Sequence, residues 1–279
     1  EESTSSSSGI LIPLLLLAVV AAAVASALMG VTFSAHALDP GALPEGAQIT
    51  QGQADISQSA GSMVINQSSD KLITNWDTFN IGESASVQFV QPDASSAALN
   101  RVLDNNPSQI LGNLSSNGQV FLVNPAGVFF GENAQVDVGG LVASTLDIND
   151  QDFLDGKLAF ENGTATQGTI ENLGKISAKN GMVAMIAAQV VNRGQIVADS
   201  GQVAMASGDK VTLDFTGDGL MTVTVEQAVI DGLVENKGLI QANDGGSVVM
   251  TADAASEIFK SVVNNDGVSF ATGLESKGG

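Results

Sequence analysis

The sequence of 279 residues contains no cysteine and no tyrosine, and only one histidine and one tryptophan. Without cysteine the chain has no disulfide, no thiol nucleophile and no Cys/His zinc site. A serine–histidine–carboxylate triad would need His36, which lies in a segment that we expect to be removed. A GxxxxGK(S/T) phosphate-binding loop is absent as well. These absences leave few routes to catalysis, and we predict that the protein is not an enzyme.

Basic residues are also scarce, because ten Lys and Arg stand against thirty Asp and Glu and give a net charge of −20 at pH 7. A nucleic-acid partner requires a basic patch, so we expect none. Aromatic residues make up 4% of the chain, whereas 44% of it is hydrophobic and 31 residues are glycine. This combination predicts a narrow core of thin aliphatic layers.

The N-terminal region contains one long apolar stretch, residues 10–33, which carries no charge. It is followed by Ala35-His36-Ala37, a small-x-small cleavage site. We predict that residues 1–37 are a secretory signal peptide cleaved after Ala37, although Glu1-Glu2 and a serine run replace the usual basic start. The alternative is a transmembrane anchor, since more than about 18 apolar residues can span a bilayer.

In the middle of the chain, two short apolar runs, Val120–Val123 and Val128–Phe130, flank Asn124-Pro125-Ala126-Gly127. Pro125 has a fixed φ and favours an extended Asn124, while Gly127 can adopt positive φ. The segment is therefore predicted to be strand, tight turn, strand. On spacing alone, one hairpin of an ordinary β domain explains it equally well.

The second half contains an internal repeat, in which Asn-x-Gly-x-Ile is followed by Gly-x-Val-x-Met, and its copies start at Asn172, Asn192 and Asn236. The first two copies are 20 residues apart and the third lies 44 further on. A period near 20 predicts a β-solenoid, in which equal residues stack from coil to coil and the asparagines form a ladder. The excess before the third copy predicts an inserted hairpin, residues 211–225.

Several smaller features lead to further predictions. Residues 63–65 and 87–90 are predicted strands. Ser95–Leu103 is the one predicted helical turn, with a loop that contains alanine as the alternative. Trp76 is expected to pack under an N-terminal cap, with a place in a ligand platform as the alternative. Asp147, Asn149, Asp150, Asp152 and Asp155 are expected to share a loop. Such oxygen-rich loops can bind Ca²⁺ or serve a polysaccharide lyase, but a solvated acidic loop is the commoner case, and we predict no metal and no cofactor.

The turn and its surroundings resemble the Asn-Pro-Asn-Gly-Ile region of the secretion domain in filamentous-haemagglutinin-type two-partner secretion (TPS) exoproteins. The residues that carry this resemblance are Asn124-Pro125-Ala126-Gly127-Val128, Phe130-Gly131, Val138–Thr145, and, upstream, 65–69, 75–82 and 98–102. It covers residues 38–279. Ala126 and Val128 replace the third and fifth family residues. The family's second motif, Asn-Pro-Asn-Leu, is absent; its place falls at Gln91-Pro92-Asp93-Ala94, and Asn106-Pro107 lies in another context.

The resemblance implies an all-β fold, namely a right-handed parallel β-helix with an N-terminal β cap and a protruding hairpin. It implies that residues 38–279 are the secretion-targeting domain of a large adhesin-like exoprotein of a Gram-negative bacterium. This protein would be recognised in the periplasm by the POTRA domains of an outer-membrane TpsB-type transporter and would fold at the cell surface.

The turn Asn124–Val128 is the candidate for recognition by that transporter, unless these residues only nucleate the fold. The alternative function is a surface adhesin or matrix module, whose solenoid face binds host cells or glycans directly.

Overall fold

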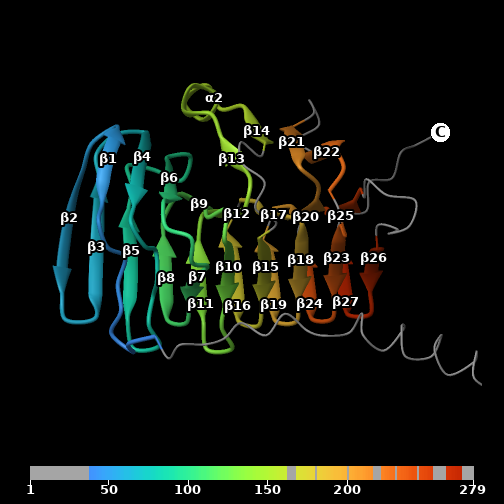
Figure 1. Cartoon of the computed structure of the whole chain (residues 1–279), viewed down its shortest axis with the longest axis horizontal. Helices are drawn as coiled ribbons and strands as arrows, with labels where there is room; N and C mark the ends of the chain where they lie inside the picture. The colour runs from blue at the N-terminus through green and yellow to red at the C-terminus, as the bar shows by residue number, and fades with distance from the viewer. Residues whose placement is uncertain are drawn as a thin grey trace, which may run out of the picture. The chain divides into compact units, whose positions relative to one another are not determined.

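The computed structural model describes residues 38–161, 168–179, 181–199, 201–215, 221–229, 231–243, 245–253 and 262–271. Leu38–Gly279 form one compact unit, and the predicted signal peptide lies outside the described residues. Within them, three sheets of mainly parallel strands run side by side along a stack of coils (Figure 1). In this described part of the chain, α-helix is confined to six residues, and no helix there has the length and hydrophobicity to cross a membrane.

Each complete coil contributes one strand to each sheet. The eight-stranded sheet contains, in spatial order, β1 (Gln48–Gln51), β4 (Lys71–Trp76), β6 (Ala97–Val102), β9 (Gln119–Val123), β12 (Gly140–Ser144), β17 (Val183–Ala187), β20 (Val203–Ser207) and β25 (Val248–Ala252). The six-stranded sheet contains β7 (Ser108–Ile110), β10 (Gly127–Phe130), β15 (Thr169–Asn172), β18 (Gln189–Asn192), β23 (Leu233–Asn236) and β26 (Val262–Asn265).

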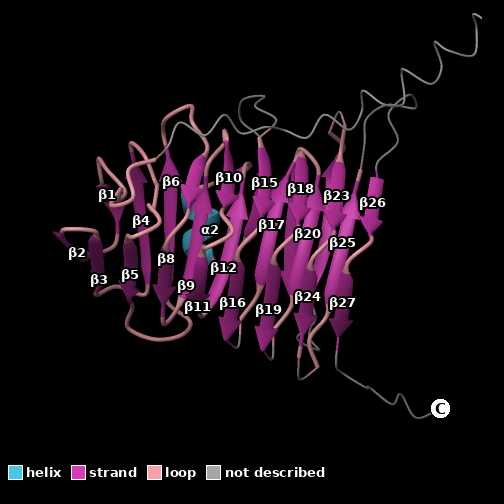
Figure 2. Ribbon diagram, turned by 90° about the horizontal axis from the view of Figure 1, so that it is seen from below, coloured by secondary structure: helices cyan, strands magenta, loops and turns pink. Residues whose placement is uncertain are grey.

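The nine-stranded sheet completes the coils. It contains β2 (Ala54–Ser59), β3 (Ser62–Gln67), β5 (Ser86–Val90), β8 (Asn113–Ser116), β11 (Gln135–Val138), β16 (Lys175–Lys179), β19 (Gln195–Asp199), β24 (Leu239–Ala242) and β27 (Val268–Ala271). At the N-terminal end of the stack, β2 pairs antiparallel with β3 in this sheet, and β1 pairs antiparallel with β4 in the eight-stranded sheet. The strands β1 and β2 form the cap, and Figure 2 shows them at one end of the stack. The predicted β-helix with an N-terminal β cap is therefore confirmed.

The stacking of equal residues explains the repeat. Ile176 pairs with Ile196, which pairs with Ile240, and all three are fully buried in the interior of the stack. Gly181 and Gly201 lie at successive coil corners, where a Cβ on either would overlap the carbonyl oxygen of the coil before it. The glycine of each copy is thus required by close backbone approach.

The predicted asparagine ladder is also confirmed. Asn172 donates from Nδ2 to Oδ1 of Asn192 at 2.8 Å, Asn192 donates to Asn236 at 2.8 Å, and Asn236 donates to Asn265 at 2.8 Å. Asn172, Asn192 and Asn236 are fully buried. The ladder therefore satisfies polar groups inside the stack, where an unpaired amide would be costly.

Two insertions interrupt the period of 20. Thr169 pairs with Gln189 at this period. Gly127 pairs with Thr169, and Gln189 pairs with Leu233, across much longer separations in sequence, because each of these two intervals contains an insertion. The first insertion contains β13 (Asp147–Ile148), α2 (Asp150–Asp155) and β14 (Leu158–Glu161), and the second is the hairpin of β21 (Lys210–Phe215) and β22 (Met221–Gln227). The predicted hairpin is confirmed, although the turn expected at residues 216–219 lies outside the described residues.

The two insertions pair with each other, because β14 runs antiparallel to β21. Together they form a four-stranded sheet that covers the outer face of the eight-stranded sheet (Figure 1). A second core lies between the two sheets, in which the rings of Phe121 and Phe153 meet edge to face at 5.2 Å and Phe160 is fully buried. This second core, with its aromatic residues, differs from the single aliphatic core that composition predicted.

Two local predictions were wrong. Residues 97–102 of the predicted helical turn Ser95–Leu103 form β6, because β4 and β9 pair with both of its edges and outweigh the helix propensity of alanine. The expected acidic loop, 147–155, is β13 followed by α2. Asn149 caps this helix by accepting from the backbone N–H groups of Gln151 and Asp152, and Gly156 ends it at φ 79°.

Candidate functional site

The predicted turn is a corner of one coil, where the chain leaves the eight-stranded sheet and enters the six-stranded sheet. β9 and β10 flank it, as predicted, but they do not pair with each other: β9 pairs with β6 and β12, and β10 pairs with β7 and β15. The alternative of an ordinary hairpin is therefore wrong.

Asn124 holds the corner together from the inside. Its side chain is fully buried, and Nδ2 donates to the carbonyl oxygen of Asn106 and to Oγ of Ser108, both at 3.0 Å. Its Oδ1 accepts from the backbone N–H of Ala126 at 2.9 Å, and its carbonyl oxygen accepts from the N–H of Gly127 at 3.0 Å. One asparagine thus closes the turn and joins it to the preceding coil.

Gly127 and Val128 continue this internal frame. Gly127 has φ +123°, and a Cβ there would lie 2.7 Å from the carbonyl oxygen of Thr169. Val128 is fully buried and pairs with Ser108 in one neighbouring coil and Ile170 in the other. Three of the five predicted site residues are therefore inside the fold.

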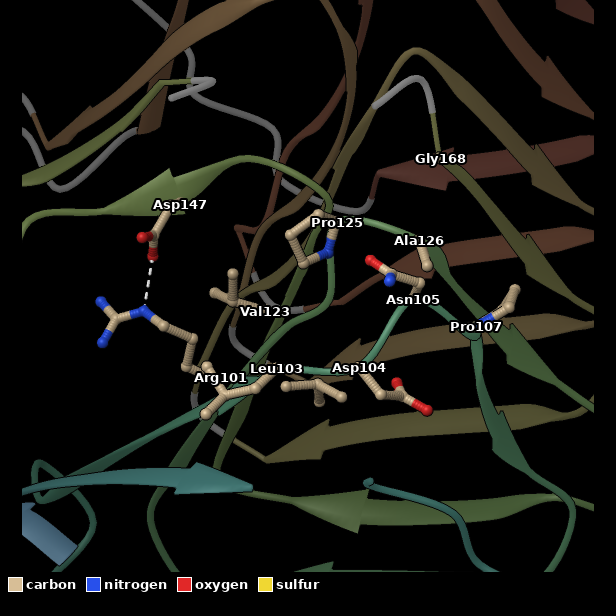
Figure 3. Close-up of a pocket in the computed structure, with 11 residues that line it drawn as sticks. Arg101, Leu103, Asp104, Asn105, Pro107, Val123, Pro125, Ala126, Asp147 and Gly168 are labelled. Carbon is tan, nitrogen blue, oxygen red and sulfur yellow. Dashed lines mark hydrogen bonds and ion pairs between the residues drawn. The ribbon is translucent and has the colours of Figure 1, made fainter. Parts of the chain in front are cut away.

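Pro125 and Ala126, in contrast, line an open hollow of about 690 Å³ (Figure 3). Its other walls come from the segment that joins β6 to β7, where Leu103 is 55% exposed, and from Gly168 at the entry to β15. The first insertion leaves the coil at this corner, which opens the hollow beside the turn. The turn therefore presents two of its residues at the surface and hides the other three.

Arg101 forms one end of the hollow and connects it to the first insertion. Its Nε pairs with Asp147 at 2.8 Å, and its second terminal nitrogen pairs with Asp150 at 2.9 Å and donates to the carbonyl oxygen of Ile148 at 2.9 Å. Burial alone would lower the pKa of Arg101, but the hydrogen bonds and charges of Asp147 and Asp150 outweigh it and raise that pKa.

The acidic residues considered as a calcium site are consequently engaged elsewhere. Asp147 and Asp150 face Arg101, and Asp152 and Asp155 lie 3.5 Å and 3.4 Å from the ammonium of Lys157. Among the described residues, no three acidic or histidine side chains converge on a point that would suit a metal ion. This cluster serves to attach and cap the insertion.

Asn106-Pro107 has a role that sequence reasoning missed. Asn106 accepts the hydrogen bond from Asn124, and Pro107 lines the hollow. An Asn-Pro pair 18 residues before Asn124-Pro125, close to one coil length, was the signal that the two segments stack. At the expected place of the second motif, Gln91 is buried and its Nε2 donates to Gln67 at 3.1 Å.

Trp76 lies where it was expected, beneath the cap. It is 1% exposed, its ring meets that of Phe79 edge to face at 5.5 Å, and its Nε1 donates to Oδ1 of Asn100 at 3.0 Å. The indole is therefore a core residue whose polar atom is satisfied, and the alternative of a ligand platform is wrong.

Comparison with known proteins gives concordant matches. A family model described as the TPS secretion domain matches residues 41–279. The heme/hemopexin-binding proteins of Haemophilus influenzae strain Rd and of H. influenzae are each 34% identical to this chain, in alignments of 216 and 249 residues that cover 72% and 79% of it. The same alignments cover 23% and 26% of the two relatives, so the chain spans about a quarter of the length of these curated relatives.

Among solved structures, the chain is similar to the crystal structure of the HMW1 secretion domain from H. influenzae. The two are 30% identical with a TM-score of 0.66, and the match covers 74% of this chain and 62% of that chain. The relatives are secretion domains and binding proteins by their descriptions, and none of them is described as an enzyme.

Proposed function

Because this chain belongs to the TPS secretion-domain family, we propose that it is the targeting domain of a large adhesin-like exoprotein, recognised in the periplasm by the POTRA domains of its outer-membrane transporter. TPS domains belong to secreted exoproteins of Gram-negative bacteria and work with a TpsB transporter in two-partner secretion. We further propose which surface contacts the transporter, that the chain passes through the periplasm, and that it folds as a β-helix at the cell surface.

The contact surface is the edge of the hollow at the turn. Asn124, Gly127 and Val128 are buried and hold the corner, whereas Pro125 and Ala126 face the hollow beside the exposed Leu103. A recognition element needs a fixed geometry inside and an apolar edge outside, so this corner would form in the periplasm, before the rest of the stack is completed at the cell surface, and would present the edge at a defined position. This division of the turn is the observation that supports the proposal.

The route to the surface follows from the remaining features. Residues 1–37 direct the chain across the inner membrane and are removed after Ala37, and residues 38–279 then form the secretion domain. A chain without cysteine cannot be locked by a disulfide before it reaches the transporter. Outside, the last folded coil offers unpaired backbone N–H and C=O groups with which the next coil pairs, so that the free energy of folding biases transit without ATP.

The test is co-expression with the candidate transporter and measurement of the secreted fraction. Ala126→Asp and Leu103→Asp place a charge at the edge of the hollow without touching the buried frame, and each is expected to reduce export several-fold. Val90→Asp is the matched control, because Val90 is 42% exposed on β5, away from the hollow. Circular dichroism of the purified variants checks that each one folds.

Two outcomes would contradict the proposal. If the wild-type chain is exported equally well without the transporter, two-partner secretion does not apply to it. If Ala126→Asp and Leu103→Asp are exported as well as Val90→Asp, the hollow is not the contact surface, and the turn serves folding alone.

The names of the curated relatives favour a second role, binding of heme or hemopexin by the exoprotein as a whole. We assign that role to parts of such a protein outside this domain. Heme iron is held by His, Cys or Tyr, or by Met together with His, and this chain has seven Met but only one His, in residues 1–37, and neither Cys nor Tyr. Purified residues 38–279 are therefore expected not to shift the Soret band of added hemin, and a shift would place the binding here. Direct adhesion through the solenoid face would instead appear as cell binding by the same purified domain.

A further inference from the structure

A second pocket, of about 410 Å³, lies between the eight-stranded sheet and the layer formed by the insertions. Its floor is the outer face of the sheet, where Phe121 and Met182 are buried. Its other side comes from Leu158 at the start of β14 and from Phe215 at the end of β21, which is 49% exposed. A volume of this size falls within the range of roughly 300–1,000 Å³ that is typical of small-molecule sites.

The pocket exists because of how the two insertions meet the sheet. Gly181 and Gly201 at the coil corners have no side chains to fill the space at its rim, and the stacked backbone leaves no room for a Cβ at either position. The apolar walls of the pocket are therefore formed where the insertions pack on the sheet, and the pocket stays open at the rim where the two glycines lie. An exposed Phe215 beside such a space is an apolar surface that a ligand could cover.

Lys71 brings a positive charge to this pocket. Eight of the ten basic residues are described, and six of those eight form ion pairs: Arg101, Lys157, Lys179, Arg193, Lys210 and Lys237. Of the two others, Lys175 is exposed, whereas Lys71 is half-buried and lines the pocket. Within the described part of the chain, no carboxylate lies within ion-pair distance of the Lys71 ammonium, although the chain has thirty acidic residues.

The surroundings of this ammonium hold it in place but leave its hydrogen-bonding capacity unused. Nζ lies 4.9 Å from the centre of the Phe153 ring, a cation–π contact that occupies none of its three N–H donors. Burial lowers the pKa of Lys71, and the charge of Asp70 opposes that effect only in part. A carboxylate placed beside Nζ would stabilise the charged form of Lys71, which burial disfavours.

We propose that this pocket binds a small amphipathic carboxylate, with its apolar body between Phe121, Met182, Leu158 and Phe215 and its carboxylate paired with Lys71. The proposal is independent of transport, because the pocket lies away from the turn and shares no lining residue with the hollow. The acidic surface repels anions at long range, but at an ionic strength of about 0.15 M that repulsion is screened beyond about 8 Å.

The experiment is isothermal titration calorimetry of the purified domain with 1-naphthaleneacetate and with its neutral analogue 1-naphthaleneacetamide. The wild-type domain is expected to bind the acid about tenfold or more tightly than the amide, because a charge-assisted hydrogen bond is lost in the amide. Lys71→Met keeps the apolar stem and is expected to bring the affinity for the acid down to that for the amide. Lys175→Met, which removes the other lysine that forms no ion pair among the described residues, is expected to change the affinity for neither probe.

A pocket-filling variant separates the apolar contribution. Leu158→Trp is expected to weaken binding of both probes, while circular dichroism reports an unchanged fold. Equal affinity of the wild-type domain for acid and amide, or no binding of either, would overturn the proposal without reference to any variant. Unchanged acid binding by a folded Lys71→Met domain would also overturn it.

Discussion

At the scale of single residues, two properties shape the turn: the hydrogen bonds of one side chain and the backbone conformation of another residue. Asn124 supplies the hydrogen bonds that close the corner, and Gly127 supplies a φ of +123° that other residues rarely adopt. The structure therefore separates residues that shape the corner from Pro125 and Ala126, which the corner presents. Sequence alone treated all five residues, Asn124 to Val128, as one candidate site.

The first prediction concerns Gly127→Ala. The new Cβ would lie 2.7 Å from the carbonyl oxygen of Thr169 in a backbone conformation unfavourable to alanine. We expect a loss of about 2–3 kcal/mol in the free energy of unfolding, measured by urea denaturation followed by circular dichroism.

Gly156→Ala is the matched control for this substitution. Gly156 also has positive φ, at +79°, but a Cβ there would meet no atom within 4 Å. Only the conformational cost remains, about 1 kcal/mol. Equal losses in the two variants would show that close approach to Thr169 contributes nothing.

At the scale of elements, neighbouring strands decide what a segment becomes. Ala97-Ala98-Leu99 has good helix propensity, but it lies between β4 and β9 and forms β6 because both edges are paired. The reverse happened at residues 150–155, where a cap at Asn149 and a stop at Gly156 were sufficient for a six-residue helix. Both cap residues are visible in the sequence, but the acidic composition of the segment led to the prediction of a loop.

The second prediction tests the asparagine ladder as an element. Asn192→Ala removes the acceptor of Asn172 and the donor to Asn236 in one step, and it leaves buried amide groups without partners. We expect a loss of about 2–3 kcal/mol in the free energy of unfolding, again by urea denaturation.

Asn243→Ala serves as the control within the same stack. Asn243 pairs with Asp199 at 2.6 Å and with Gln241 at 2.8 Å at a coil corner, and it is only half-buried. Its replacement by alanine is expected to lower the free energy of unfolding by about 1 kcal/mol at most. If the two variants were equally stable, the ladder would be incidental to the strength of the stack.

At the scale of the whole molecule, two insertions far apart in sequence build one layer. They leave the stack after β12 and after β20, and they meet through β14 and β21 over the outer face of the eight-stranded sheet. That face is apolar in β9, β12, β17 and β20, and it would be exposed without the layer. Arg101 connects the layer to the stack through Asp147 and Asp150.

The third prediction follows from the net charge of −20. Like charges destabilise a compact state, and salt screens them because the Debye length falls from about 30 Å at 0.01 M to about 10 Å at 0.1 M. The thermal unfolding midpoint is therefore expected to rise between about 20 mM and about 300 mM NaCl. Chloride is the suitable anion, since sulfate strengthens apolar burial by itself.

A midpoint that falls with NaCl would show the opposite balance. In that case attractive pairs such as Arg101 with Asp147 and Asp150 contribute more than the general repulsion, and screening weakens them. The Arg101→Met variant distinguishes the two cases, because its midpoint should then lose that dependence on salt.

The sequence by itself determined the repeating part of this protein. The period of 20, the isoleucines that stack, the asparagine ladder and the inserted hairpin all follow from local patterns, because in a solenoid each coil meets only its neighbours. Asn124, Pro125 and Gly127 also defined a turn without any knowledge of the rest. The family resemblance extended these local patterns to a β-helix with a cap, and the structure confirms it.

Only the tertiary structure decided what lies beyond nearest neighbours. It showed that β9 and β10 belong to different sheets, that Asn106 accepts from Asn124, and that two separate insertions share a second core. It also placed the unpaired Lys71 beside a pocket to which both insertions contribute. These relations depend on the path of the chain in space, because no periodicity links segments that meet only across an insertion.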